Sequence, residues 1–168
     1  KPNAPLKPAE APPQPKAEAP PTDDVTDAMA KLGIDKQDLQ KYYTRVERIK
    51  KCIDIIAEKL NINKERDLII EPSAGDGRWI PYLKTLCNNV VAYDIEPDGD
   101  AEGVEKRDFL ADDMLAKIKQ FKKDYRYVHI VGNPPWKGLE ESFIKTPCQK
   151  FVRSISYLLP ATHMKEDH

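Results

Sequence analysis

The run Asn133-Pro134-Pro135-Trp136 has residue types and spacing suited to chemistry on a planar amine. Two consecutive prolines make a rigid turn and lack backbone N–H donors, so the Pro134 carbonyl meets no competing local donor. The Asn133 side-chain oxygen and that carbonyl can both accept hydrogen bonds from one NH2 group. Such acceptors orient the amine and favour a pyramidal nitrogen with an exposed lone pair, and Trp136 offers a flat face for stacking a base. A Pro-Pro turn carrying a surface Trp is the alternative interpretation.

A Gly-x-Gly turn at Gly75 and Gly77 is the second unusual feature. Glycine is needed where the backbone turns sharply or closely approaches a ligand. Asp94 follows about 20 residues later, a spacing that suits a carboxylate accepting hydrogen bonds from ribose hydroxyls. The pattern predicts a nucleoside-binding half-site. A plain tight turn, with Asp94 solvated or capping, is the alternative.

The residues around this turn favour one kind of nucleoside. Ile80 stands where a dinucleotide fingerprint has its third glycine, which brings a helix N-terminus close to a pyrophosphate. Glu71 and Asp76 make the loop acidic, so it would repel phosphate. A ligand with ribose, positive charge and no phosphate fits better, and S-adenosyl-L-methionine is such a molecule.

The segment Arg107-Asp108-Phe109 ends a further predicted strand, at the place where an adenine ring would lie. Asp108 could accept a hydrogen bond from the exocyclic amine of the ring, with Phe109 packing nearby. The alternative is that Asp108 caps the helix that follows.

Short apolar runs alternate with helical patterns and must position these loops. Strands are predicted over 68–70, 90–93, 104–109, 127–131 and 155–159, and helices over about 78–86, around 115–121 and over about 141–152. Such alternation indicates parallel pairing, right-handed crossovers and helices on both faces. The sequence therefore predicts an α/β fold, a Rossmann-like doubly wound and mostly parallel sheet that stops after its fifth strand. The loops described above would meet at the carboxyl ends of the strands.

Three regions are predicted along the chain. Residues 1–24 read as a Pro/Ala-rich disordered linker, because more than half of the 15 prolines lie before residue 22. Residues 25–64 form an N-terminal helical segment, in which Thr44 and Glu47 match a capping box. Residues 65–168 form the Rossmann-like core. The apolar spacing that predicts the clearest helix involves Val46, Ile49, Ile53, Ile56 and Leu60.

Composition excludes several classes of protein. No apolar run approaches the roughly 18 residues of a membrane span, and no secretory signal is present. Three cysteines without paired spacing indicate reduced thiols, and three scattered histidines give no metal site. The expected location is intracellular, in cytoplasm, nucleoid or nucleus. A net charge of −1 gives no sign of bulk nucleic-acid affinity. The local cluster from Lys117 to Arg126 reads as a solvated helix face or as a phosphate contact.

In order along the chain, the segments 71–77, 94–97, 108–110 and 133–136 resemble the motifs of amino-type class I S-adenosylmethionine-dependent methyltransferases. Segment 41–44 is similar to the extra N-terminal motif of the adenine-N6 DNA methyltransferase type, which helps hold the methionine end of the cofactor. Segment 156–160 resembles the fifth-strand segment of that group. The resemblance covers about residues 40–160.

The resemblance implies roles for individual residues. Asn133 and Pro134 would bind the target amine and Trp136 would stack on the target base, with Pro135 completing the motif. Glu71, Ala74 and Gly75 would surround the methionine moiety, with Asp94 on the ribose and Asp108 and Phe109 on the adenine. The full set implied to bind the cofactor is Tyr43, Thr44, Glu71, Ala74, Gly75, Asp76, Gly77, Asp94, Asp108 and Phe109. Thr44 is also the predicted helix cap.

The expected function is methyl transfer to a planar exocyclic amine, with N6 of adenine in DNA as the leading substrate. Methylation of a protein glutamine or an RNA base is one alternative, and a non-catalytic module of a larger assembly is another. The family's sheet continues beyond its fifth strand into an antiparallel hairpin, for which no segment is found here. Because the chain also begins at Lys1, we expect a fragment or processed product whose parent could supply further domains.

Overall fold

The computed structural model describes residues 43–99, 101–135 and 139–160, which contain a sheet of five parallel strands. The strands are β1 (Leu68–Glu71), β2 (Val90–Asp94), β3 (Val104–Lys106), β4 (Val128–Gly132) and β5 (Ser154–Tyr157). Their order in the sheet is β3-β2-β1-β4-β5. The chain adds β2 and β3 on one side of β1 and then β4 and β5 on the other, so the switch point lies between β1 and β4. The predicted α/β Rossmann-like fold is confirmed.

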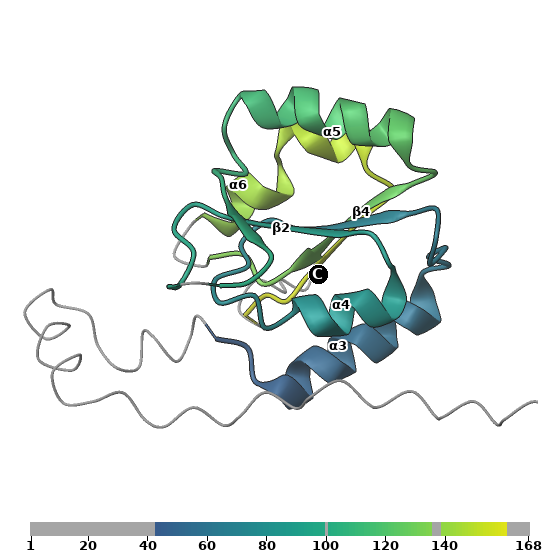
Figure 1. The fold of residues 1–168 in the computed structure, drawn as a ribbon, viewed down its shortest axis with the longest axis vertical. Helices are drawn as coiled ribbons and strands as arrows, with labels where there is room; N and C mark the ends of the chain where they lie inside the picture. Colours follow the sequence, from purple (N-terminus) through teal and green to yellow (C-terminus); the bar gives the residue numbers. More distant parts are fainter. Residues whose placement is uncertain (1–42, 100, 136–138, 161–168) are drawn as a thin grey trace, which may run out of the picture. The chain divides into compact units, whose positions relative to one another are not determined.

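Helices cover both faces of this sheet (Figure 1). On one face lie α3 (Val46–Lys59) and α4 (Ile80–Leu86), and on the other lie α5 (Asp113–Asp124), α6 (Glu140–Ile144) and the 3₁₀ helix η1 (Pro147–Phe151). The central strand β1 serves both sides, because Leu68 and Ile70 pack with α5 while Ile69 packs with α3 and α4. Burying each of these side chains contributes about 1.5–3 kcal/mol, which explains why β1 is apolar on both faces.

The start of α3 differs from the prediction. The helix buries the predicted apolar face, through Ile49, Ile53 and Ile56. It begins at Val46 with Arg45 as its N-cap, and no side chain caps it. The predicted capping box is therefore wrong: the Thr44 hydroxyl lies 3.2 Å from Asn133 Nδ2 and accepts its hydrogen bond instead. The remainder of the predicted helical segment before residue 43, and the predicted linker, lie outside the described residues.

The helix predicted over 141–152 is two separate pieces, α6 and η1. The chain is extended at Thr146 (φ −54°, ψ 143°), because helical backbone is disfavoured in a residue that precedes a proline. Thr146 does not continue α6 but is the N-cap of η1. Its side chain accepts a hydrogen bond from the Cys148 amide. Strand β3 is also shorter than predicted and ends at Lys106.

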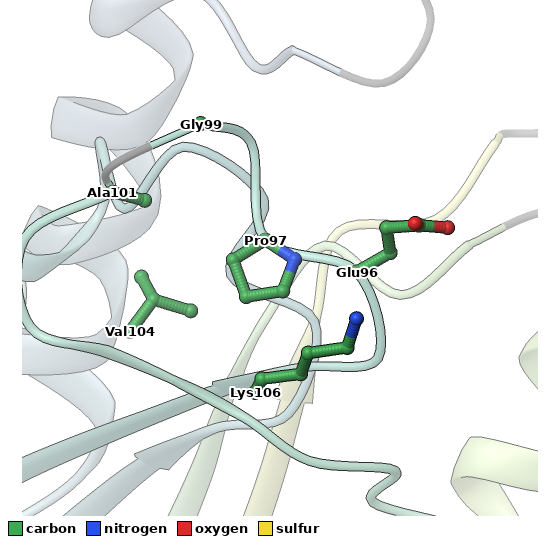
Figure 2. A pocket seen from close by; sticks show the side chains of 6 residues that line it. All are labelled: Glu96, Pro97, Gly99, Ala101, Val104 and Lys106. Atoms are coloured by element: carbon green, nitrogen blue, oxygen red, sulfur yellow. The ribbon is translucent and has the colours of Figure 1, made fainter.

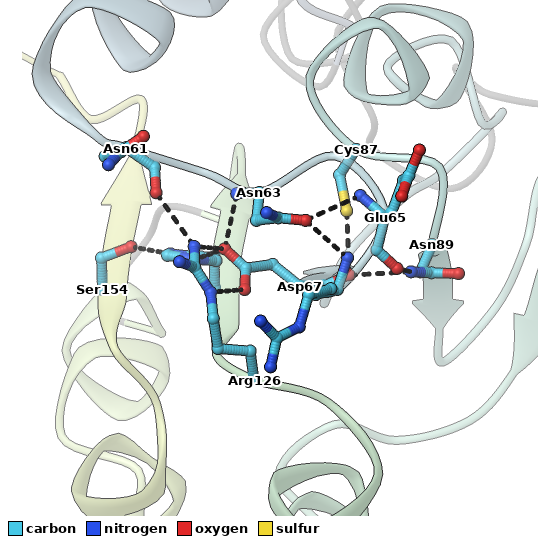
Figure 3. A network of polar contacts seen from close by, with 10 residues as sticks. Asn61, Asn63, Glu65, Asp67, Cys87, Asn89, Arg126 and Ser154 are labelled. Carbon is cyan, nitrogen blue, oxygen red and sulfur yellow. Dashed lines mark hydrogen bonds and ion pairs between the residues drawn. The ribbon is translucent and has the colours of Figure 1, made fainter.

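A buried polar network ties the amino ends of the strands together (Figure 3). Asp67, fully buried just before β1, accepts hydrogen bonds from Arg126 Nε and Nη2, both at 2.8 Å, and from the Asn63 amide. His129 on β4 links Asp67 Oδ2 to Ser154 Oγ on β5, with its ring nitrogens at 3.3 and 2.7 Å. Burial alone would raise the pKa of Asp67, but these hydrogen bonds outweigh it and lower the pKa to about 2. This network fixes the end of the sheet opposite to the loops that carry the predicted chemistry.

Candidate functional site

The glycine turn after β1 is a compact loop held to the end of β2. Gly75 and Gly77 have φ angles of 56° and 77°, in the left-handed region that only glycine adopts easily. The Gly75 amide donates to Asp94 Oδ2 at 2.8 Å, and the Ala74 amide donates to the Tyr93 carbonyl at 2.8 Å. The end of β2 therefore shapes the turn.

Close packing explains why Gly77 must be glycine. A Cβ atom at that position would lie 3.2 Å from both Ile80 Cδ1 and Val104 Cγ2. Ile80 in turn packs with Ala74 and Ala92 beneath the turn. The apolar side chain at the third fingerprint position thus fills the space below the loop, as expected for a turn that does not present a helix end to a pyrophosphate.

Asp94 already accepts two backbone hydrogen bonds. One oxygen takes the Gly75 amide and the other takes the Glu96 amide, each at 2.8 Å. An ionised carboxylate has about four acceptor positions, so two remain for a ligand. Its geometry therefore accommodates the predicted ribose contact, as well as the alternative in which Asp94 only organises the loop.

Asn133 joins three segments that are distant in sequence. Its main-chain carbonyl accepts a hydrogen bond from Ser73 Oγ at 3.0 Å, and its Nδ2 donates to Thr44 Oγ1 at 3.2 Å. Pro134 beside it is buried and Pro135 is half-buried, while Trp136 lies outside the described residues. The amide of Asn133 is thus held in place by the loop after β1 and by the segment before α3.

The segment before α3 crosses the glycine turn. Tyr43 Oη donates to Asp98 Oδ2 at 2.6 Å, and the Arg78 guanidinium lies 4.4 Å from the centre of the Tyr43 ring. Arg78 also makes an ion pair with Asp76 and donates to the Thr44 carbonyl at 3.4 Å. Burial, followed by the bond to Asp98, raises the pKa of Tyr43, so this hydroxyl remains a donor. Tyr43 and Thr44, the described part of the predicted N-terminal motif, therefore lie against the turn.

Glu71 ends β1 and is the most buried acid of the site. Only 1% of its surface is exposed, and within the described part of the chain its Oε2 accepts no hydrogen bond. Burial is the main cause of a pKa well above the usual value, and the charges of Asp76 and Asp94 raise it further. Such a position favours the uncharged form of the acid.

Asp108 lies in a turn and Phe109 lies in the hydrophobic core, and neither placement was predicted. Asp108 Oδ1 accepts from the Leu110 amide at 2.8 Å, so it caps a turn, while the N-cap of α5 is Asp112. The alternative prediction, that Asp108 caps the helix that follows, is therefore wrong: Asp108 caps the turn that precedes α5. The Phe109 ring is 2% exposed and stacks on Phe143 with the ring centres 6.0 Å apart, so it belongs to the core beneath α5.

Three residues of the site were not predicted: Ser73, Arg78 and Asp98. They are tied to predicted residues by the contacts above. Their closeness in sequence to the glycine turn or to Asp94 is the only signal that could have identified them.

A surface pocket of about 520 Å³ lies beside this site, between the β2–β3 connection and β3 (Figure 2). Its lining residues are Glu96, Pro97, Gly99, Ala101, Val104 and Lys106. None of them was predicted to bind a ligand, but Val104 also packs against the cluster of Ala74, Ile80 and Ala92 beneath the glycine turn. The pocket extends the site toward the edge of the sheet.

Most residues of the basic cluster, which lies on α5 and just after it, make intramolecular contacts. Arg126 pairs with Asp67, and Lys117 lies 3.9 Å from Glu105 Oε1. The ammonium groups of Lys119 and Lys122 lie 5.1 and 5.7 Å from the centre of the Phe151 ring. Both interpretations of the cluster, a solvated helix face and a phosphate contact, remain predictions.

Neither a metal centre nor a known family identifies this site. Among the residues described, no three His, Cys, Asp or Glu side chains are grouped to hold a metal ion, and none of the helices has the length and hydrophobicity that a membrane span requires. No protein-family model matches this chain, and no curated protein has significant sequence similarity to it.

Proposed function

We propose that this protein is an S-adenosyl-L-methionine-dependent methyltransferase that acts on a planar exocyclic amine, N6 of adenine in DNA. The observation that carries the proposal is the convergence of four segments at the carboxyl ends of β1, β2 and β4. Hydrogen bonds join the glycine turn to Asp94, Ser73 to Asn133, and Asn133 to Thr44. This arrangement combines a nucleoside-type turn with a rigid pair of amine acceptors.

The residues present fit the proposed cofactor. Glu71, buried and with one oxygen unbonded to any described residue, suits the ammonium group of an amino acid. Asp94 retains acceptor positions for ribose hydroxyls, and the acidic loop disfavours a phosphate-bearing nucleotide. When bound, the cofactor supplies an electrophilic methyl group on a sulfonium.

The contribution of the protein to the reaction is alignment. The Asn133 side-chain oxygen and the Pro134 carbonyl accept from the two N–H bonds of the target amine and turn its lone pair toward the donor. A positioned reactant of this kind needs no strong base, because orientation removes much of the barrier. The proton lost by the amine leaves to water, since amide oxygens are too weakly basic to retain it. Contacts among Tyr43, Arg78 and Asp98 hold the segment before α3 against the glycine turn.

The test is methyl transfer from labelled cofactor to separate DNA, RNA and protein acceptors. We expect label in adenine of DNA, with Asn133→Ala lowering the transfer rate by about 100-fold or more while cofactor affinity changes little. Asn88→Ala, on the exposed surface at the opposite end of the sheet, is the matched control.

Three results would contradict this proposal in different ways. Label only in RNA or only in protein would replace the substrate but keep the amine chemistry. Loss of cofactor affinity in Asn133→Ala with an unchanged single-turnover rate would remove the role given to Asn133. Cofactor binding without transfer to any acceptor would favour a non-catalytic module.

A further inference from the structure

Glu71 occupies a position in which a carboxyl group is costly to ionise. Its side chain lies over Gly132 of the neighbouring strand β4, where an added Cβ would be 3.2 Å from Glu71 Cγ and 3.8 Å from Oε1. The residue before Asn133 is therefore small enough to leave room for this acid. The acid thus lies at the switch point of the sheet, with almost no contact with water.

The charged groups that act on Glu71 share its sign. Asp76 on the glycine turn and Asp94 at the end of β2 both raise its pKa, in addition to the larger effect of burial. The cation nearest in sequence, Arg78, forms its ion pair with Asp76. Protonation relieves both the burial cost and the repulsion, so the uncharged acid is the stable form while no cation is bound.

We propose that Glu71 is a protonated acid in the ligand-free protein and releases its proton when a cationic ligand binds at the carboxyl ends of β1 and β4, beside the glycine turn. In this step the O–H bond of the carboxylic acid breaks, the proton passes to water or buffer, and the carboxylate pairs with the ligand cation. The inference rests on the proposed function, because it takes that cation to be the ammonium group of the cofactor or its product. Affinity should then rise with pH until Glu71 is ionised in the free protein.

Calorimetry of the full chain in buffers of different ionisation enthalpy measures this proton directly. The probes are S-adenosylhomocysteine, which carries the ammonium group, and 5′-methylthioadenosine, which lacks it. At a pH below that at which Glu71 ionises in the free protein, we expect release of up to about one proton per S-adenosylhomocysteine bound and none with 5′-methylthioadenosine, with release declining at higher pH.

Glu71→Gln keeps the shape of the uncharged acid but cannot ionise. We expect it to abolish proton release and to weaken S-adenosylhomocysteine binding about tenfold, while 5′-methylthioadenosine binding stays unchanged. Glu58→Gln, an exposed acid on α3, is the matched control and should behave as the parent protein. A carbon NMR titration of the Glu71 carboxyl, assigned from its loss in Glu71→Gln, reads the protonation state without any ligand.

The outcomes separate the two proposals. S-adenosylhomocysteine binding without proton release, or a Glu71 carboxyl that titrates near its usual pKa, would overturn the coupling and leave the proposed function intact. Failure of both probes to bind, with Glu71 still titrating high, would contradict the proposed function and the coupled release with it. Release that persists in Glu71→Gln would assign the proton to another group and overturn the role of Glu71.

Discussion

At Asn133, the direction of the amide matters as much as the residue type. The amide nitrogen donates to Thr44 Oγ1, and the main chain is held by Ser73. Because Thr44 is only 5% exposed, this hydrogen bond is shielded from water and fixes the amide plane. A residue outside the Asn-Pro-Pro motif therefore positions the one that would contact the substrate amine.

Replacing Thr44 tests this positioning. Thr44→Val keeps the shape but removes the acceptor, so we expect the methyl-transfer rate to fall about tenfold, the equivalent of one hydrogen bond. Thr44→Ser retains the hydroxyl and should keep most of the rate. Single-turnover kinetics with saturating cofactor measures the effect. Equal rates in the valine and serine variants would show that the hydroxyl does not position Asn133.

The sequence patterns account for some of these residues and miss others. The glycine turn and the Asn133 motif were predictable because their residue types are unusual after a strand. The capping box at Thr44 failed because the pattern describes a local bond and cannot exclude a partner 89 positions away. The burial of Glu71 was not predicted either, since an acid next to a glycine turn normally suggests exposure.

Among the elements, β1 and β4 are held together at both ends by polar contacts. At the amino end the Arg126 guanidinium binds the buried Asp67 carboxylate through two hydrogen bonds of 2.8 Å. At the carboxyl end Ser73 reaches Asn133 across the same pair of strands. The register of these strands, in which Ile70 pairs with Ile130, thus determines how the site loops face one another.

Removing Arg126 would leave Asp67 as a buried charge without its main partner. We expect Arg126→Ala to lower the free energy of unfolding clearly, while Lys123→Ala on the exposed side of α5 has little effect. Denaturant unfolding followed by circular dichroism measures both. A loss as small as that of the control would mean that the network does not stabilise the sheet.

The same network predicts how stability depends on pH. The folded pKa of Asp67 is lowered to about 2, so its contribution is present above its usual pKa and is lost as pH falls toward 2. Burial lowers the pKa of His129 despite its contact with Asp67, so stability also begins to fall below about pH 6.5. In His129→Gln the decline near pH 6 should disappear while the acidic decline remains. An unchanged profile would contradict this account.

At the scale of the whole molecule, hydrophobic patterning explains the sheet better than it explains the helices. The strands were predicted because burial on both faces requires apolar runs, and all residues of β1 and β4 are indeed buried. The break at Thr146 was missed because the apolar spacing continues across Pro147 into η1. The pocket beside β3 was not predictable, because it depends on how the β2–β3 connection folds over the strand.

The most direct test of the central claim is a backbone-amide NMR titration of the full chain with S-adenosylhomocysteine. We expect saturable shifts of the amides of Gly75 and Gly77, in the loop after β1, and of Asn133, in the loop after β4. Residues of the opposite end, such as Asp67 and Asn88, should stay unchanged. Saturable shifts confined to that opposite end, or no shifts at any concentration, would contradict a cofactor site built from the glycine turn and Asn133.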